Sequence, residues 1–159
     1  MALSAEEILQ KYAAGDRNFA GVELDNIKFR DAQLSDINLD SASLDGTFFL
    51  GTNLHNACLK SANLIDSNFH QANLSQADLS GANLEGADLG GSNLQETNFE
   101  GANLKSASLR DTNLENANLK NTDLRGAALH NANLRGVQLD NTRLDGAYLK
   151  GTLLEKQSV

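Results

Sequence analysis

Large apolar residues recur at every fifth position along nearly the whole chain. From Phe19 to Leu154, twenty-eight successive positions at this spacing are Leu or Phe, twenty-three of them Leu and five Phe. Neither regular secondary structure keeps such a series on one side, because five residues turn an α-helix by about 140° net and an odd step in a strand changes face. A short extended segment followed by a two-residue corner does keep one inward direction. The pattern therefore predicts one small unit repeated down the chain.

The positions around each large residue, which we call the centre of its repeat, support this unit. Two residues before the centre stands Ala fourteen times and Thr seven times. Residues two apart in an extended segment face the same side, so this small residue and the centre both point inward. The residue between them is usually Asn or Asp and points outward. Two residues after the centre Gly occurs eleven times, and otherwise mostly Asn, Asp or Ser, as corners require.

The unit is thus A-[ND]-L-x-x, as in ANLSQADLSGANLEGADLGGSNL over Ala72–Leu94, and it resembles the A(D/N)LXX motif of the pentapeptide-repeat family. The resemblance covers Arg17–Glu155, and the stretch AEEILQKYAAGDRNFAG is similar to cyanobacterial members. It implies an all-β solenoid, a right-handed quadrilateral β-helix with four repeats in each coil. Twenty-eight repeats then make about seven coils over residues 16–155. The predicted core centres include the following large residues, of which the second to fourth are spaced by twenty and would stack in one column: Phe19, Phe29, Phe49, Phe69, Leu89, Phe99.

Residues 1–15 are expected to form a helical cap over the first coil. Ser4 is a suitable N-cap and Glu7, three residues later, completes a capping box, while Gly15 is a suitable stop. These signals predict a helix over Leu3–Ala14 that hides the core and the backbone edge of the first coil. The alternative is a helix that docks a partner.

The C-terminal end is expected to be exposed, with residues 156–159 as a tail too short for a similar cap. Tyr148 and Leu153 place large apolar groups at positions that elsewhere carry Asn or Asp. Members of the family often dimerise end to end through such a coil. The resemblance therefore implies a symmetric homodimer through Tyr148, Leu153 and Leu154.

Composition and charge narrow the class of protein. The net charge of −8 disfavours nucleic acid and anionic membranes as partners. Cys58 is the single cysteine, so no internal disulfide is possible, which fits a reducing compartment. The chain shows no signal-peptide pattern and no apolar stretch of the ~20 residues that a membrane span needs. These features predict a cytoplasmic protein.

No group of residues has the spacing of a catalytic or metal site. His55, His70 and His130 each follow a repeat centre and so belong to outward corners. With four repeats in a coil, His70 and His130 share a column but lie three coils apart, about 14 Å, too far to bind one metal. The recurring glycines are explained by the corners and do not form a phosphate-binding loop. We therefore predict a protein that is not an enzyme and has no cofactor and no metal.

An apolar departure from the repeat is the first candidate for function. Phe48 and Leu50 put large apolar side chains outward on both sides of the inward Phe49, and Ile65 is expected about one coil away. Phe48, Leu50 and Ile65 would form an exposed patch that binds a protein partner. The alternative is that these side chains fold over the corner and pack locally.

Two departures concern charge. From Ser61 to Leu104 there are six acidic residues, Asp66 to Glu100, and no Lys or Arg, which a solvated surface also explains. One predicted corner column contains no acid and could receive an anionic partner. That column has these members: Arg30, Leu50, His70, Gly90, Arg110, His130, Lys150.

The function expected from these features is a non-enzymatic interaction or regulatory scaffold for an unknown protein partner. The resemblance also implies an alternative, because some members of the family mimic DNA and protect type II topoisomerases such as gyrase from quinolone-like poisons. The charge of −8 and the expected dimer agree with that alternative. Thirteen Lys and Arg residues interrupt the anionic surface and weigh against it.

Overall fold

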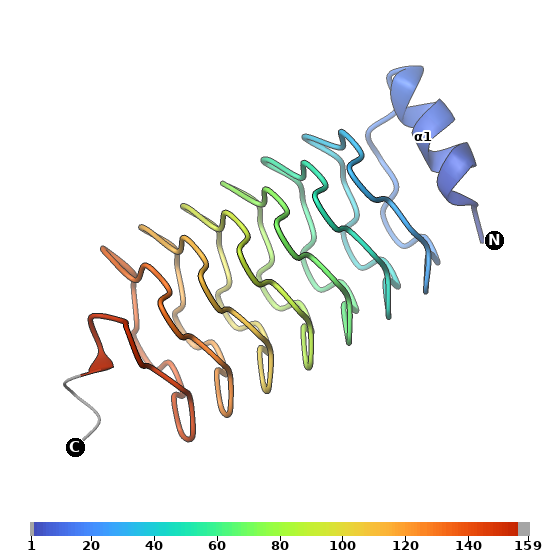
Figure 1. The fold of residues 1–159 in the computed structure, drawn as a ribbon. Coiled ribbons are helices and arrows are strands. Elements are labelled where there is room, and N and C mark those ends of the chain that lie inside the picture. Colours follow the sequence, from blue (N-terminus) through green and yellow to red (C-terminus); the bar gives the residue numbers. More distant parts are fainter. Residues whose placement is uncertain (1, 156–159) are drawn as a thin grey trace.

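The protein is a rod of stacked four-sided coils, as a computed structural model of residues 2–155 shows (Figure 1). Parallel β-bridges join residues twenty apart, from Asn18↔Asn38 at one end to Ala128↔Tyr148 at the other. Four repeats therefore make one coil, and each repeat contributes one bridge residue instead of a longer strand. This register confirms the predicted coil. The predicted tail, 156–159, lies outside the described residues. Within the described part, no helix combines the length and apolar character needed to cross a bilayer.

Each corner is a β-turn whose second corner residue has a positive φ. From residue 21 to residue 151 this position holds sixteen non-glycine residues and eleven glycines, all with φ between 52° and 81°. A positive φ at this position alone is the signature of a type II turn. Glycine adopts it without strain, and Asn and Asp tolerate it better than other residues. The predicted corner position is therefore correct, and its composition follows from the backbone.

The repeat satisfies its own backbone, and this explains the preference for Asn or Asp at the outward middle position. In the repeat Thr52–Asn56, the N–H of Thr52 closes the turn, that of Asn53 donates to the coil before, and those of Leu54 and Asn56 donate to the coil after. The remaining N–H, from His55, donates to Oδ1 of Asn53 at 3.1 Å. A side-chain oxygen at the middle position therefore completes the hydrogen bonding of the repeat.

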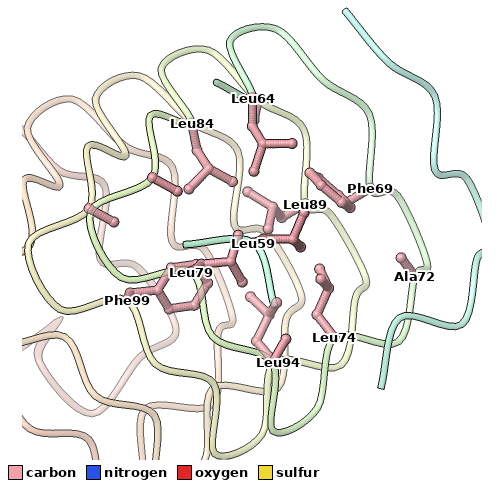
Figure 2. Close-up of a cluster of buried hydrophobic side chains, with 14 of the residues drawn as sticks. Leu59, Leu64, Phe69, Ala72, Leu74, Leu79, Leu84, Leu89, Leu94 and Phe99 are labelled. Carbon is pink, nitrogen blue, oxygen red and sulfur yellow. The ribbon is translucent and has the colours of Figure 1, made fainter. Parts of the chain in front are cut away.

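The interior of the rod is filled by the repeat centres (Figure 2). All six predicted core centres are buried, with at most 4% exposed. The phenylalanines spaced by twenty do stack: the ring centroids of Phe29 and Phe49 are 5.5 Å apart and those of Phe49 and Phe69 are 4.8 Å apart, with interplanar angles of 13° and 7°. Phe99 lies in a different column, directly after Leu79. The labelled side chains of Figure 2, from both columns, point into the same interior.

Helix α1, Ala5–Ala13, lies across the N-terminal end of the rod (Figure 1). The predicted capping box is present, with Ser4 as N-cap and Glu7 as its partner. Ile8 is fully buried in the core, and Tyr12 donates from Oη to the carbonyl of Ser35 at 2.8 Å. The helix therefore covers the first coil. It is slightly shorter than predicted.

The C-terminal end is open, and the seventh coil is incomplete. Leu139, Leu144 and Leu149 are only half-buried, unlike the centres before them. In the described part, Leu153 makes no bridge to the coil before it. The chain turns instead, and Glu155 Oε2 accepts the N–H of Gly151 at 3.0 Å. Among the described residues, the ladder of bridges therefore ends at Tyr148, one repeat short of seven full coils.

Candidate interaction face

The outward middle positions of the repeats form four faces along the rod, with one residue from each coil. On three faces Asn or Asp occupies four or five of the seven positions, and on the other face only two. We call this other face the divergent face. It consists of these residues: Lys28, Phe48, Asn68, Asp88, Ser108, Ala128, Tyr148. The predicted acid-free column, Arg30 to Lys150, is the corner that directly follows it.

Among the described residues, the divergent face has the fewest side-chain caps: only Asn68 and Asp88 accept the following N–H, from His70 and Gly90. Elsewhere Asn side chains link successive coils, as where Asn118 Nδ2 donates to Asn98 Oδ1 at 3.1 Å. Where Lys28, Phe48 and Ser108 stand, no side-chain oxygen accepts the following N–H. In the described structure the N–H groups of Arg30, Leu50 and Arg110 accordingly have no partner. This face therefore has both free donors and unusual side chains.

An apolar hollow of about 320 Å³ lies at the N-terminal part of this face, and five residues line it: Lys28, Arg30, Phe48, Leu50, Asn68. Phe48 is 40% exposed and Leu50 is half-buried. The Lys28 ammonium lies 5.8 Å from the Phe48 ring centroid. Among the described residues, Arg30 pairs only with the exposed Asp31, with 3.9 Å between Nε and Oδ2. Ile65 is half-buried and is not among the lining residues. The structure thus joins Phe48 with Leu50 and adds two cations that the sequence patch did not include.

A polar hollow of about 460 Å³ lies two coils further along the same face, at Gly90. Gly90 is the acid-free column's member without a side chain, and a Cβ there would lie 2.9 Å from Nδ1 of His70. His70 Nδ1 is 3.9 Å from Oδ2 of Asp88. Arg110 is exposed and has no ion-pair partner among the described residues. The hollow therefore presents the unpaired guanidinium of Arg110 and the imidazole of His70 beside the carboxylates of Asp88 and Asp111.

At the C-terminal part of the divergent face, Tyr148 is 59% exposed and stacks on His130, with ring centroids 5.7 Å apart. Nδ1 of His130 is the buried side-chain atom that has no hydrogen-bond partner within the described part of the chain. Leu153 is 55% exposed, whereas Leu154 is only 6% exposed. Of the three residues predicted for a dimer end, Tyr148 and Leu153 therefore offer surface and Leu154 belongs to the core.

The remaining titratable residues do not gather. Among residues 2–155 no group of three or more His, Cys, Asp or Glu side chains could hold a metal ion. His55 bonds Ser75 Oγ through Nδ1 at 2.9 Å. Arg125 donates to both carboxylate oxygens of Asp123, at 2.9 and 2.7 Å, and these hydrogen bonds lower the pKa of Asp123 to about 2.

Sequence reasoning found the single residues but missed the face that they share. The signal was present, because counting Asn and Asp at the middle positions with a period of twenty separates one face from the other three. That count becomes meaningful once the backbone role of the middle residue is known. The acidic residues from Asp66 to Glu100, in contrast, are distributed over two faces and three corners.

Comparison with known proteins places the repeat in a family. A sequence model for pentapeptide repeats in eight copies matches residues 72–111, 82–121 and 112–151, and one for a pentapeptide repeat region matches residues 15–89. A search of curated proteins found no match.

Several solved structures are similar. HetL, a pentapeptide repeat protein involved in heterocyst differentiation regulation in Nostoc sp. strain PCC 7120, is 26% identical, with 99% of each chain covered and a TM-score of 0.38. A pentapeptide repeat protein from the Arabidopsis thaliana thylakoid lumen is 32% identical over 62% of this chain and 66% of its own, with a TM-score of 0.46. Full-length QnrB1, a plasmid-mediated fluoroquinolone resistance protein, is 18% identical over 89% of this chain and 92% of its own, with a TM-score of 0.38.

The family models together cover residues 15–151, the same part of the chain in which every corner has a positive φ and every bridge joins residues twenty apart. The family match and the geometry therefore agree, and the chain belongs to the pentapeptide-repeat family, whose fold is the right-handed quadrilateral β-helix.

Proposed function

We propose that this protein is a non-enzymatic scaffold that binds another protein through its divergent face. One observation carries the proposal: the departures from the asparagine-rich surface are concentrated on one face of four. That face holds the exposed Phe48 and Tyr148 and both hollows. Interfaces are enriched in aromatic residues and arginine and have few charged residues at their centre. A rigid rod with one such face suits a partner that lies along it.

The proposal is tested by capture of partners from a source lysate under mild cross-linking. The wild-type protein is compared with a variant of the divergent face and its following corner, Phe48→Asn with Arg110→Glu, and with a control that carries Asn73→Ser and Arg135→Glu on the next face and its following corner. We expect the first variant to lose the proteins that the wild type captures and the control to retain them. Equal capture by all three proteins would refute the proposal.

We also propose that the C-terminal end joins two copies of this chain. Half-buried Leu139, Leu144 and Leu149 leave the core of the last coil partly open, and Tyr148 and Leu153 are exposed beside it. The free backbone edge of this coil is able to pair with another edge. An isologous contact through this end buries these apolar groups in both copies.

DNA mimicry is the alternative that the charge of −8 favours. The positions of the charges favour it less. Lys105 lies near Asp123, with 3.9 Å between Nζ and Oδ2, and Lys120 lies at the same distance from Asp140. These cations break the anionic surface in the half of the rod nearest the proposed dimer contact. Protein binding through the divergent face therefore remains the preferred function.

A further inference from the structure

Resting on the proposed function, we infer that the divergent face binds an extended, acidic peptide segment that lies along the rod axis. Its apolar side chain enters the hollow of Phe48 and Leu50, and a carboxylate three residues away reaches the hollow of Gly90. The two hollows lie on one face and differ in chemistry, and this difference specifies the ligand.

The first anchor is apolar with a cationic rim. Phe48 and Leu50 form the apolar wall, and Lys28 and Arg30 stand at the edge. An aliphatic or aromatic side chain in this hollow would cover the exposed part of the Phe48 ring. The free N–H groups of Arg30 and Leu50 in the same region provide donors for peptide carbonyl groups. The two cations disfavour a basic segment.

The second anchor is polar and accepts a carboxylate. Gly90 removes the side chain that would otherwise stand between His70 and Arg110. Arg110 has neither an ion-pair partner nor a partner for its own N–H in the described structure. A guanidinium with a neighbouring N–H donor is well suited to a carboxylate. Asp88 and Asp111 also line this hollow, but Asp88 already accepts the N–H of Gly90 and Asp111 a hydrogen bond from Asn131. Their negative charge limits this anchor to a single ligand carboxylate, paired with Arg110.

The spacing of the two anchors fixes the spacing in the ligand. Leu50 and Gly90 hold the same position in coils two apart. Stacked strands are about 4.8 Å apart, so the anchors are separated by about 9.6 Å. A peptide in the extended polyproline II conformation has three residues per turn and advances about 3.1 Å per residue, so side chains three residues apart lie on the same side and are separated by about 9.3 Å. The ligand is thus an apolar residue and an acidic residue separated by two others.

The test uses fluorescein-labelled peptides of eight residues in a Ser/Gly background, measured by fluorescence anisotropy with the full chain. One peptide carries Glu three residues after Leu, a second carries Glu three residues before Leu, and a third has the same composition with the two adjacent. Two anchors do not set the peptide direction, so both orders are included. We expect one of the first two to bind at least about tenfold more tightly than the third, as burial of one apolar side chain allows.

Two variants and a matched control assign the anchors. Phe48→Asn introduces the commonest residue at the middle position, so its side chain should accept the N–H of Leu50 and keep the fold, with an unchanged or higher midpoint of thermal unfolding. The variant should bind the preferred peptide with a dissociation constant about tenfold higher than that of the wild type. Arg110→Glu should do the same, whereas Arg135→Glu, at an equivalent exposed corner on another side, should not.

The outcomes separate this inference from the proposed function. Equal binding of all three peptides, or an equal effect of Arg110→Glu and Arg135→Glu, overturns the peptide inference. If this occurs while the divergent-face variant still loses its captured proteins, the face binds protein by other chemistry. If capture is also unaffected, both the inference and the proposed function fail.

Discussion

The phenylalanine column offers a measurement of how much aromatic stacking contributes to the rod. Phe49, Phe69 and Phe99 are all fully buried repeat centres in interior coils. They differ in their aromatic neighbours, because Phe49 stacks on two rings, Phe69 on one and Phe99 on none. Replacing each by Leu, the ordinary residue at this position, gives three variants that share the packing change and differ in stacking.

The expected magnitudes follow from these contacts. An aromatic pair contributes about 0.5–1.5 kcal/mol beyond the area that it buries. Phe99→Leu sets the baseline for the smaller side chain. Phe69→Leu should lower the free energy of unfolding by about 0.5–1.5 kcal/mol more than this baseline, and Phe49→Leu by about 1–3 kcal/mol more, because two pairs are lost.

Equilibrium urea unfolding followed by far-UV circular dichroism measures the three free energies under one set of conditions. The wild-type and variant slopes should agree, since all four proteins bury nearly the same surface. If the free energies of unfolding of the three variants lie within about 0.5 kcal/mol of one another, or if Phe99→Leu is the most destabilised, aromatic stacking does not stabilise the phenylalanine column. A double variant, Phe49→Leu with Phe69→Leu, gives the coupling between the pair directly.

Three further predictions concern the ends and the charges. Light scattering should show wild-type particles of twice the chain mass of 17.0 kDa and a monomer for Tyr148→Asp with Leu153→Asp; a wild-type monomer would reject the end-to-end contact. Arg125→Gln should raise the pKa of Asp123 from about 2, as a carboxyl NMR titration would show. Because the pKa is lowered in the folded state, the stability lost in this variant should be largest above about pH 4 and vanish as the pH falls toward 2; a constant difference across that window would contradict this. In a gyrase supercoiling assay with a fluoroquinolone, we expect no protection over a stoichiometric titration, and rescue would favour DNA mimicry.

Much of the fold is encoded within single repeats. The turn bond spans three residues, and the side-chain cap from the middle residue to the next corner spans two. Such contacts depend only on near neighbours in the chain, so the five-residue pattern identifies centres, corners and outward positions without knowledge of the tertiary structure. The helix α1 was equally predictable, because Ser4 and Glu7 form a local capping box.

The candidate site was only partly predictable, because its contacts join residues eighteen to forty apart. Phe48 and Leu50 stood out as apolar departures, but Lys28, Arg30 and Asn68 join them through the stacking of coils. Gly90 looks like one more corner glycine in the sequence, although its φ is not positive, and its role appears only where His70 and Arg110 flank it.

The sequence by itself determined that each repeat turns a corner and points one large and one small side chain inward, since those choices rest on local hydrogen bonds and on side-chain size. The tertiary structure decided which outward residues share a face, because that depends on twenty residues closing one coil in register with the next. It also decided that the last described repeat leaves the ladder at Leu153, where the chain turns and Glu155 Oε2 accepts the N–H of Gly151. The surface on which this protein's function depends is therefore a property of the register between coils.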